Sequence, residues 1–525
     1  MPAMSSEIEL KFRIPAARLA ALRRAVATRS AVVEPLAAVY FDTPGEHLAR
    51  ARVALRLRRE AGGWVQTLKA EGATPMQRLE HNVVLPAMTG ASGAPADRPA
   101  LDLARHHGSL AGAVLARVLA KAQDSAAPGS SPIALTERYA TDVQRSRRVL
   151  RHGTALIELA LDEGQIRAGS AACSICEIEF ELLRGPAQAM LDVAARWVGR
   201  FGLVLDVRSK SERGHRLAQG QPASPPSHAR PLKLARQASP AQALAAMLAN
   251  PLSQVLANAS QMADNGGQAE HLHQLRVGLR RLRSVLHVFG ALPAPPADLA
   301  LGPRLAALFG QLGAARDQDA MAEWLWPALQ AAGAPPFDRL ARPAAVEKAN
   351  ADDRADAADA PDLVTLLRAP DTQQLWLAML GACQPVAPPD DPPPPSLHAL
   401  LRKPLRQRYR QVQQDAARFD VLDDAARHRL RRRIKRLRYA TELSAALWPA
   451  KPLQRLLGGL ARAQAPLGEF NDTVVALAHC QALAAQDGAA WFAVGWLSAR
   501  RQALAPVCSQ ALARLARQPG CWRRR

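Results

Sequence analysis

The sequence predicts an α+β protein, with a closed antiparallel β-barrel and flanking helices first and an all-α part of two pseudo-symmetric helical halves after it. Two observations predict this architecture. Within roughly the first 220 residues, several segments alternate apolar and charged side chains with the two-residue period of a β-strand. In the remainder, one basic helical motif occurs twice. A chain of 525 residues is long enough for two or three domains with full cores.

The first predicted strand, at residues 7–14, has one apolar face and one fully charged face. The charged face carries two carboxylates followed by two cations, which are Glu7, Glu9, Lys11 and Arg13. An ordinary half-buried strand has mixed polar residues on its solvated side. The arrangement found here suits a cation that is bridged to a polyanion.

The later predicted strands also have charged faces, and each face has mainly one sign. Cations dominate residues 53–58 and 64–69, through Arg56, Arg58 and Lys69. Carboxylates dominate residues 156–162 and 176–182, and they are Glu158, Asp162, Glu177, Glu179 and Glu181. Solvated charged faces would explain any single strand. Five strands sorted by sign instead favour a closed barrel around a shared, water-filled lumen, because dry unpaired charges are costly.

A tunnel with one acidic and one basic wall predicts a particular ligand pair. Carboxylate oxygens and water would hold Mg²⁺ or Mn²⁺, and the metal would bridge to phosphates that Arg and Lys side chains bind. The sequence has neither a Gly-rich phosphate loop of the Walker type nor a dinucleotide-binding fingerprint. The barrel is therefore predicted to be a metal-dependent phosphate site of another kind.

These residues resemble the CYTH domains of the triphosphate tunnel metalloenzymes over roughly residues 5–217. The N-terminal signature of that family is Glu-x-Glu-x-Lys, as in Glu7, Glu9 and Lys11. One departure is Asn82, where many relatives carry a further acidic residue. The other matching motifs, in the order of the family, are Tyr40-Phe41-Asp42-Thr43-Pro44, Leu55-Arg56-Leu57-Arg58, Thr67-Leu68-Lys69, Arg78-x-Glu80, Thr141-Asp142-x-x-Arg145, Glu158-x-x-x-Asp162-x-Gly164, Glu177-x-Glu179 and Ser209-Lys210.

The resemblance implies hydrolysis of a phosphoanhydride bond in a triphosphate, with Mg²⁺ or Mn²⁺ as cofactor. Catalytic roles are implied for Glu7, Glu9, Lys11, Arg56, Arg58 and Lys69. Substrate-binding roles are implied for Arg78, Glu80, Arg138, Arg145 and Lys210. Metal coordination is implied for Glu7, Glu9, Glu158, Asp162, Glu177 and Glu179, and one carboxylate would orient the attacking water.

The repeated motif in the second part has a fixed spacing of His, Arg, two adjacent cations and Arg. The first copy consists of His273, Arg276, Arg280, Arg281 and Arg283, and the second of His428, Arg431, Lys435, Arg436 and Arg438. On a helix this spacing gives a basic ridge beside a leucine seam. A charge run is usually a solvated helix face, but the duplication favours two related helical halves that bind an anion. A second pair of matching segments, at 312–319 and 467–472, follows the two copies.

The repeat resembles the CHAD domain over roughly residues 232–525. That resemblance implies binding of inorganic polyphosphate by the ten repeat residues, with the two histidines as phosphate donors rather than as bases. In fusions of CYTH and CHAD domains, it also implies inorganic triphosphate as the substrate and diphosphate and phosphate as the products. The predicted boundaries are 1–218 for the barrel, 219–231 for a linker, 232–383 and 397–525 for the helical halves, and 384–396 for a Pro-rich linker.

Two alternatives stay open. Related tunnel enzymes include adenylate cyclases and thiamine-triphosphatases, which share the charged lumen and differ in what the tunnel mouth accepts. A second class is a protein that docks on polyphosphate or nucleic acid through an inactive barrel, although the complete Glu-x-Glu-x-Lys and Glu-x-Glu sets argue against inactivity.

The composition indicates a polyanionic partner. The net charge is +22 and the pI is near 10.8. Nucleic acid is less favoured than polyphosphate, because aromatic residues make up only 4% of the chain and do not alternate with the ridge arginines except at Tyr439. Scattered cysteines and the absence of an apolar stretch of spanning length predict a cytoplasmic protein without membrane contact, and polyphosphate binding would place it at polyphosphate granules. Cys173 and Cys176 form a lone Cys-x-x-Cys and are expected to be structural.

Overall fold

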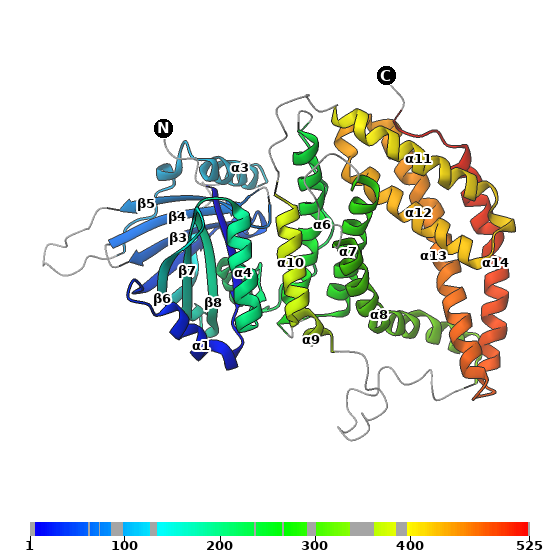
Figure 1. Cartoon of the computed structure of the whole chain (residues 1–525), viewed down its shortest axis with the longest axis horizontal. Coiled ribbons are helices and arrows are strands. Elements are labelled where there is room, and N and C mark those ends of the chain that lie inside the picture. Colours follow the sequence, from blue (N-terminus) through cyan, green and yellow to red (C-terminus); the bar gives the residue numbers. More distant parts are fainter. Residues whose placement is uncertain are drawn as a thin grey trace, which may run out of the picture. The chain divides into compact units, whose positions relative to one another are not determined.

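The structure is a computed structural model of the chain, shown in Figure 1. It describes residues 6–60, 63–72, 74–85, 98–125, 134–235, 238–264, 267–290, 301–335, 362–384 and 396–522, without the side chains of 314–323. The chain forms two compact units. Unit 1 comprises Met1–His228, Leu252–Leu275 and Leu363–Gln384, and unit 2 comprises Ala229–Pro251, Arg276–Asp362 and Pro385–Arg525. The predicted Pro-rich linker lies outside the described residues apart from its two end positions.

Unit 1 contains the predicted barrel. Among the described residues, its sheet has nine antiparallel strands in the order β5-β4-β3-β2-β6-β7-β8-β1-β9, and β5 also pairs with β1. The first strand closes the barrel by pairing with β5 at Ser6–Ile8 and with β8 at Glu9–Arg13. The strands are β1 (Ser6–Arg13), β2 (Val32–Asp42), β3 (Val53–Glu60), β4 (Gly63–Glu71), β5 (Gln77–Leu85), β6 (Thr136–His152), β7 (Ala155–Ala168), β8 (Ala171–Arg184) and β9 (Val204–Leu205).

Two tight turns set the register of the three longest strands. Two residues join β6 to β7 and β7 to β8, and each turn begins with a glycine in the left-handed region, Gly153 at φ 56° and Gly169 at φ 57°. The resulting register places Asp162 directly opposite Arg145 on one side and Glu177 on the other.

Helices cover the outer, apolar face of the barrel. These helices are α1 (Ala16–Val26), α2 (His47–Arg50), α3 (Leu110–Asp124) and α4 (Ala187–Phe201). On β8, Phe180 packs edge-on against Phe12 and Trp197, with ring centroids 5.5 and 5.7 Å apart. This burial explains why the apolar residues of each strand alternate with charged ones.

The inside of the barrel is charged at one end and apolar at the other. Leu36, Tyr40, Tyr139 and Ile166 form part of a buried cluster on the inward face, together with Leu217 of α5 (Lys210–Ala218). The α5 helix begins with a Ser-x-x-Glu cap, in which the Ser209 hydroxyl accepts from the Glu212 amide. The sequence pattern predicts a water-filled lumen throughout, but α5 packs against part of the lumen.

Unit 1 also contains helical segments that follow the barrel in sequence. The helices concerned are α6 (Pro240–Ala263), α7 (Ala269–Phe289), α9 (Leu363–Arg368) and α10 (Pro370–Ala382). The α10 helix packs on α4, as Figure 1 shows. Both α6 and α7 pass from one unit to the other, at Pro251 and Leu275.

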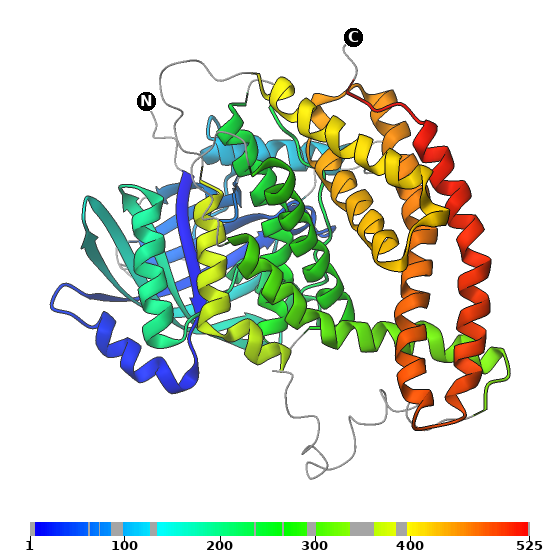
Figure 2. The same ribbon diagram turned by 45° about the vertical axis from the view of Figure 1, so that its right-hand side comes forward.

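Unit 2 contains helices and no strand in its described residues, which agrees with the predicted all-α part. Besides its shares of α6 and α7, it contains α8 (Leu301–Ala331), α11 (Leu397–Ala417), α12 (Asp424–Leu443), α13 (Ala450–Ala484) and α14 (Ala490–Arg517). Figure 2 shows α13 and α14 side by side, and α11 packs on both α12 and α14. The apolar seam predicted for the repeat is buried at Leu279, Leu282, Leu430 and Ile434. Within the described part of the chain, no helix has the length and apolar character needed to span a membrane.

Candidate functional site

Strand register brings the predicted charged residues together on the inward face of the barrel. Lys69 lies directly opposite Glu80, Lys11 opposite Glu179, and Glu9 opposite Glu181. Because side chains on directly opposite positions lie about 5 Å apart at Cβ, these pairs form one continuous charged surface. That surface divides into two clusters with opposite charge balance.

The first group, the Lys210 cluster, consists of three carboxylates and four cations. Its carboxylates are Asp162, Glu177 and Glu179, and its cations are Lys11, Arg145, Lys210 and Arg213. The Lys210 ammonium lies 2.7 Å from Asp162, 2.5 Å from Glu177 and 2.8 Å from Glu179. The Arg145 guanidinium donates to Asp162 at 2.7 and 2.6 Å and to Glu179 at 2.6 Å. These contacts leave the cluster with a surplus of positive charge.

Buried groups in the Lys210 cluster have shifted pKa values for identifiable reasons. Burial raises the pKa of Glu179, but Lys210 and Arg145 outweigh burial and hold it well below its usual range. Burial lowers the pKa of Lys11 against the opposing effect of Glu177. The Lys11 ammonium also donates to the carbonyl of Arg208. Glu179 is therefore ionised and tightly paired with Lys210 and Arg145.

A second group, the Glu7 cluster, has the opposite balance. It contains five carboxylates around two cations, namely Glu7, Glu9, Glu80, Glu158 and Glu181 around Lys69 and Arg78. The Lys69 ammonium lies 2.9 Å from Glu7 and also contacts Glu80, while Arg78 lies 3.5 Å from Glu9. A third cation, Arg147, reaches Glu158 at 3.3 Å. Carboxylates remain in excess.

This excess of negative charge appears in the pKa values. Burial and a hydrogen bond with Glu80 raise the pKa of Glu7 to about 8. Burial also raises the pKa of Glu181, with Glu158 and Glu80 acting in the same direction and Lys69 against them. In contrast, Lys69 and the hydrogen bond from Glu7 overcome the effect of burial and lower the pKa of Glu80 to about 2. Glu7 and Glu80 thus share one proton that a metal cation could replace.

A basic wall lies beside the two clusters. Burial lowers the pKa of Arg58, and so do the nearby guanidinium groups of Arg56 and Arg145. Arg56 donates to the Tyr40 hydroxyl at 3.1 Å, and its buried Nε atom has no hydrogen-bond partner in the described structure. Three arginines that repel one another and keep an unused donor are suited to bind a phosphate group.

The donor chemistry fits a divalent hard cation. Asp162, Glu177 and Glu179 have ligand oxygens within 4.8 Å of one another, but four cations already neutralise them. The Glu7 cluster offers the same carboxylate oxygens with net negative charge. Carboxylate oxygen is the preferred protein ligand of Mg²⁺ and Mn²⁺, and the net negative charge of the Glu7 cluster would attract such a cation, although within the described residues only the oxygens of Asp162, Glu177 and Glu179 lie that close together.

The structure does not bring every predicted residue into these clusters. Arg138 occupies a register shift in β6 and donates to Glu46 at 3.1 Å, away from the charged end of the lumen. Arg13 pairs with Asp264 of the turn after α6. Conversely, Arg213 contacts Glu177 and Tyr40 contacts Arg56, although the sequence pattern included Tyr40 only as part of a family motif and did not single out Arg213. Arg213 could have been found because it lies one helical turn after Lys210.

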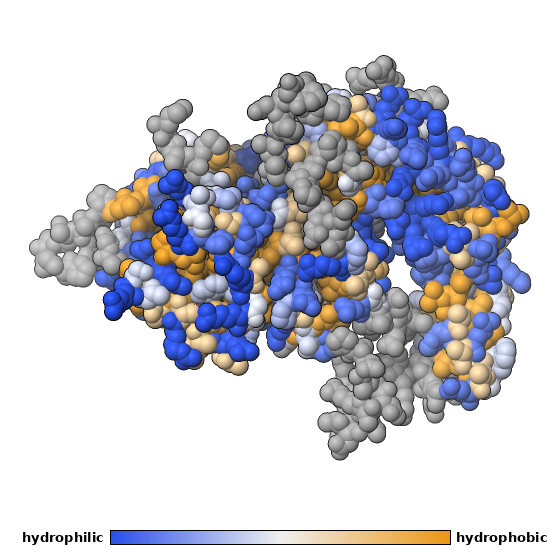
Figure 3. All heavy atoms as spheres, in the orientation of Figure 1, coloured by the Kyte–Doolittle hydropathy of each residue, from blue (hydrophilic) through white to orange (hydrophobic). Residues whose placement is uncertain are grey.

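The helical repeat forms a second basic surface, in unit 2. On α7 and α12, the basic ridge consists of Arg276, Arg280, Arg283, Arg431, Lys435 and Arg438. Burial and the nearby Arg431 and Arg280 lower the pKa of Lys435 to about 7. The Asp472 carboxylate acts on Lys435 in the opposite direction. Figure 3 shows hydrophilic side chains gathered over this part of unit 2, around α11 and α12.

The remaining predicted ridge residues have varied positions. Arg436 donates to His287 at 3.4 Å, and Arg408 of α11, which the sequence did not single out, donates to it at 2.8 Å. Arg281 is buried and donates to Asn250 at 3.0 Å, so it lies away from the ridge. His428 contacts Asn471 through its Nδ1 atom. His273 lies in the segment of α7 that belongs to unit 1.

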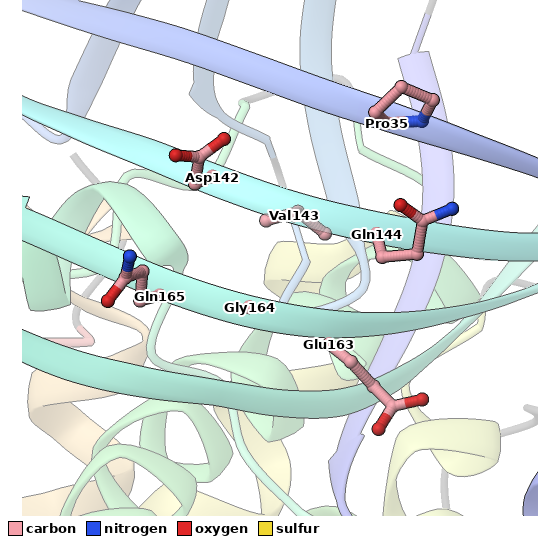
Figure 4. Close-up of a pocket in the computed structure, with 7 residues that line it drawn as sticks. All are labelled: Pro35, Asp142, Val143, Gln144, Glu163, Gly164 and Gln165. Carbon is pink, nitrogen blue, oxygen red and sulfur yellow. The ribbon is translucent and has the colours of Figure 1, made fainter.

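A separate hollow on the outside of the barrel is not a phosphate site. It has a volume of about 460 Å³ and is lined by Pro35, Asp142, Val143, Gln144, Glu163, Gly164 and Gln165. Figure 4 shows it along β6 and β7. Its two carboxylates are paired with arginines, Asp142 with Arg167 at 2.7 Å and Glu163 with Arg23 at 3.0 Å. The lining contributes no cation to bind an anion.

The two cysteines of the Cys-x-x-Cys segment are free thiols. Because they are three apart on β8, Cys173 and Cys176 project to opposite faces of the sheet. Burial raises the pKa of both. They cannot chelate one metal ion together.

Comparison with known proteins identifies two domain families, one after the other along the chain. The CYTH domain family matches residues 5–202, and the CHAD domain family matches residues 246–481. The chain therefore belongs to the proteins that join a CYTH domain to a CHAD domain. The crystal structure of the CHAD domain from the plant Ricinus communis is 32% identical, with a TM-score of 0.46, and the match covers 57% of this chain and 98% of that one.

Two further relatives match the barrel part. An inorganic triphosphatase of Haemophilus influenzae is 28% identical over 185 residues, which are 35% of this chain and 46% of the relative. The chain thus matches about half the length of that curated relative. A Hippeastrum protein, described as a candidate adenylyl cyclase with a dominant triphosphatase activity, is 17% identical, with a TM-score of 0.27 over 41% of this chain and 96% of that chain.

Proposed function

We propose that the barrel hydrolyses inorganic triphosphate to diphosphate and phosphate with Mg²⁺ or Mn²⁺, and that the basic ridge binds inorganic polyphosphate. The observation that carries the first part is the separation of charge inside one lumen. The carboxylate-rich Glu7 cluster lies next to the basic wall of Arg56, Arg58 and Arg145, whose guanidinium groups repel one another. A divalent cation bound together with the triphosphate anion would neutralise the excess negative charge of the Glu7 cluster and the excess positive charge of the basic wall.

Each side chain then has a role in the reaction. Arg56, Arg58, Arg145 and Lys210 would bind phosphate oxygens and stabilise the charge that develops on the leaving diphosphate. Glu7, Glu9 and Glu181 would hold the divalent cation, which when bound supplies positive charge beside the reacting phosphate. A remaining carboxylate of the lumen would orient the attacking water and accept its proton.

The packing of α5 against the lumen favours a small substrate. The α5 helix brings Lys210 and Arg213 into the Lys210 cluster, and beside them the hydroxyls of Tyr139 and Ser211 form a hydrogen bond of 2.8 Å. A nucleoside or thiamine moiety attached to the triphosphate would need space that these side chains occupy. Inorganic triphosphate needs none.

A phosphate-release panel tests the proposed activity. The full chain is incubated with inorganic triphosphate, ATP, thiamine triphosphate and long-chain polyphosphate, each with Mg²⁺, with Mn²⁺ and with chelator. We expect inorganic triphosphate to give the highest kcat/KM and the chelator to abolish turnover. A higher kcat/KM for ATP or thiamine triphosphate would contradict the substrate assignment, and turnover in chelator would contradict the metal.

The proposal for polyphosphate rests on the ridge. Lys435 lies among Arg280, Arg431 and Arg438, and burial together with repulsion from these three cations lowers its pKa. A chain with one negative charge per phosphate would relieve that repulsion along the whole ridge. Polyphosphate binding in turn suggests a cytoplasmic protein located at polyphosphate granules. Tighter binding of duplex DNA than of polyphosphate, at equal phosphate concentration and physiological salt, would favour nucleic acid instead.

A further inference from the structure

The segment between β9 and α5, at residues 206–209, supplies two features of the lumen. The carbonyl of Arg208 accepts a hydrogen bond from the Lys11 ammonium. Two residues later, Lys210 forms three ion pairs with the carboxylates of the Lys210 cluster. The position of this segment therefore sets the position of two lysines that face the proposed substrate.

Helices from later in the chain hold this segment from outside the lumen. The Leu205 amide donates to Gln373 of α10 at 2.8 Å, and the Val207 amide donates to Ser260 of α6 at 3.2 Å. Neither helix belongs to the part of the sequence that matches the CYTH family, which ends at residue 202. Residues of the helical domain thus complete the hydrogen bonding of a barrel segment.

The Arg208 side chain is the centre of this support. It is 4% exposed and donates to Asp206 at 2.9 and 2.7 Å, to Gln261 at 2.9 Å and to Asp264 at 2.8 Å. Burial raises the pKa of Asp206, but Arg208 and Lys11 outweigh it and keep that pKa well below its usual range. A buried guanidinium with four such bonds has a fixed position.

Asp264 has a second contact that bears on the same lysine. It pairs with Arg13, which lies two residues after Lys11 on β1. Asp264 therefore contacts both chain segments that determine the Lys11 environment, β1 itself and the Arg208 segment. Since Arg208 would keep Asp206 and Gln261 as partners without Asp264, loss of Asp264 should shift these segments rather than unfold them.

We propose that Gln261 and Asp264, at the end of α6, are positioning residues for triphosphate hydrolysis. They act through Arg208 and Arg13 to hold Lys11 and Lys210 against the substrate. The inference rests on the proposed function of the barrel and deepens it, because it assigns to the helical domain a part in the catalytic geometry.

The test uses the full chain and steady-state hydrolysis of inorganic triphosphate. We expect Asp264→Asn to lower kcat about tenfold and to change KM less than about twofold, because misplaced charges lose contact mainly with the transition state. Asp264→Glu should restore kcat to within about threefold of the parent, because it restores the charge. The matched control is Asp142→Asn, which removes an Asp–Arg pair on the outer face of the barrel and should leave both constants unchanged.

A second variant tests the inference if Asp264→Asn does not fold. Gln261→Met removes the acceptor of Arg208 and keeps the volume, and we expect a smaller fall in kcat, about threefold. Combined with Asp264→Asn it should lower kcat by less than the product of the two effects, because both act through Arg208. Thermal melting establishes that each variant is folded.

Three results would overturn the inference: kcat of folded Asp264→Asn within twofold of the parent, an equal loss in Asp142→Asn, or fully multiplicative effects of the two α6 variants. A parent protein without turnover would contradict the proposed function instead. In that event crystal structures of the parent and of Asp264→Asn decide the inference, and unchanged positions of the Lys11 and Lys210 ammonium groups would overturn it.

Discussion

Binding of a divalent cation to the lumen should release a proton from Glu7. The pKa of this carboxyl is raised to about 8 by burial and by its hydrogen bond with Glu80. At pH 7 a group with that pKa is protonated in about 0.9 of the molecules, and at pH 9.5 in about 0.03. A metal ligand must be deprotonated, so metal binding at pH 7 should release about 0.9 proton from this site.

The sign of the pH dependence follows from the same shift. Protons compete with the metal below the raised pKa, so apparent affinity should rise as pH rises. The apparent Kd for Mn²⁺ should fall about tenfold per pH unit between pH 6 and 7.5 and level off above about pH 8.5.

Calorimetry measures the released protons directly. Mn²⁺ is titrated into the full chain at pH 7 in two buffers of different ionisation enthalpy, and the difference in observed heat gives the proton count. Glu7→Gln should reduce the count to below about 0.2. The control is Glu163→Gln on the outer face, where the carboxylate pairs with Arg23, and its proton count should equal that of the parent.

Two outcomes would refute this reasoning. One is metal binding by the parent with release of less than about 0.2 proton at pH 7. The other is the same release from Glu7→Gln as from the parent, which would assign the proton to another group.

Three further predictions concern the two sites. Arg56→Ala should lower kcat/KM about 10- to 100-fold, with KM raised and kcat lowered together, because it removes charge-assisted hydrogen bonds to phosphate. The control is Arg98→Ala, which removes an exposed ion pair with Glu137 and should change neither constant. Glu9→Gln should lower kcat at least about tenfold with an unchanged melting temperature, because the lumen loses an oxygen ligand but no apolar contact. A turnover within twofold of the parent would show that Glu9 is not a metal ligand. Binding of long-chain polyphosphate, followed by salt-dependent fluorescence titration, should weaken at least about 100-fold on combined replacement by Ala of Arg276, Arg280, Arg431 and Lys435. Triphosphate turnover should persist in that variant. The control for net charge replaces the exposed Arg24, Arg50, Arg117 and Arg184 together by Ala, and its polyphosphate binding should equal that of the parent.

Sequence periodicity predicted the inward residues of the barrel because a strand has only two faces. The alternation on β1 placed Glu7, Glu9 and Lys11 together, and the strand register sets Glu9 opposite Glu181, Lys11 opposite Glu179, and Glu7 opposite Arg78 of β5. Lys210 could be selected only through the family resemblance, since nothing in its local pattern shows that α5 enters the barrel.

What the sequence could not predict depends on contacts between distant residues or on local irregularities. Arg13 continues the charged face of β1, yet it pairs with Asp264, about 250 residues later. Arg138 lies an odd number of residues from the inward Arg145 and stands at a register shift of β6, where it donates to Glu46. Arg281 follows the repeat spacing, but its side chain lies on the buried side of α7, where Asn250 accepts its hydrogen bond. No local pattern contains this information.

The dependence of the barrel on later helices has a consequence for its synthesis. The Leu205 amide bonds to Gln373, which lies 168 residues further along the chain. A ribosome that adds about 5 to 20 residues per second needs roughly 8 to 34 s to reach that residue after Leu205. For that interval the nascent barrel exposes polar backbone groups and the face of α4 that α10 later covers. Chaperone binding and proteolysis during translation should therefore concentrate on this face.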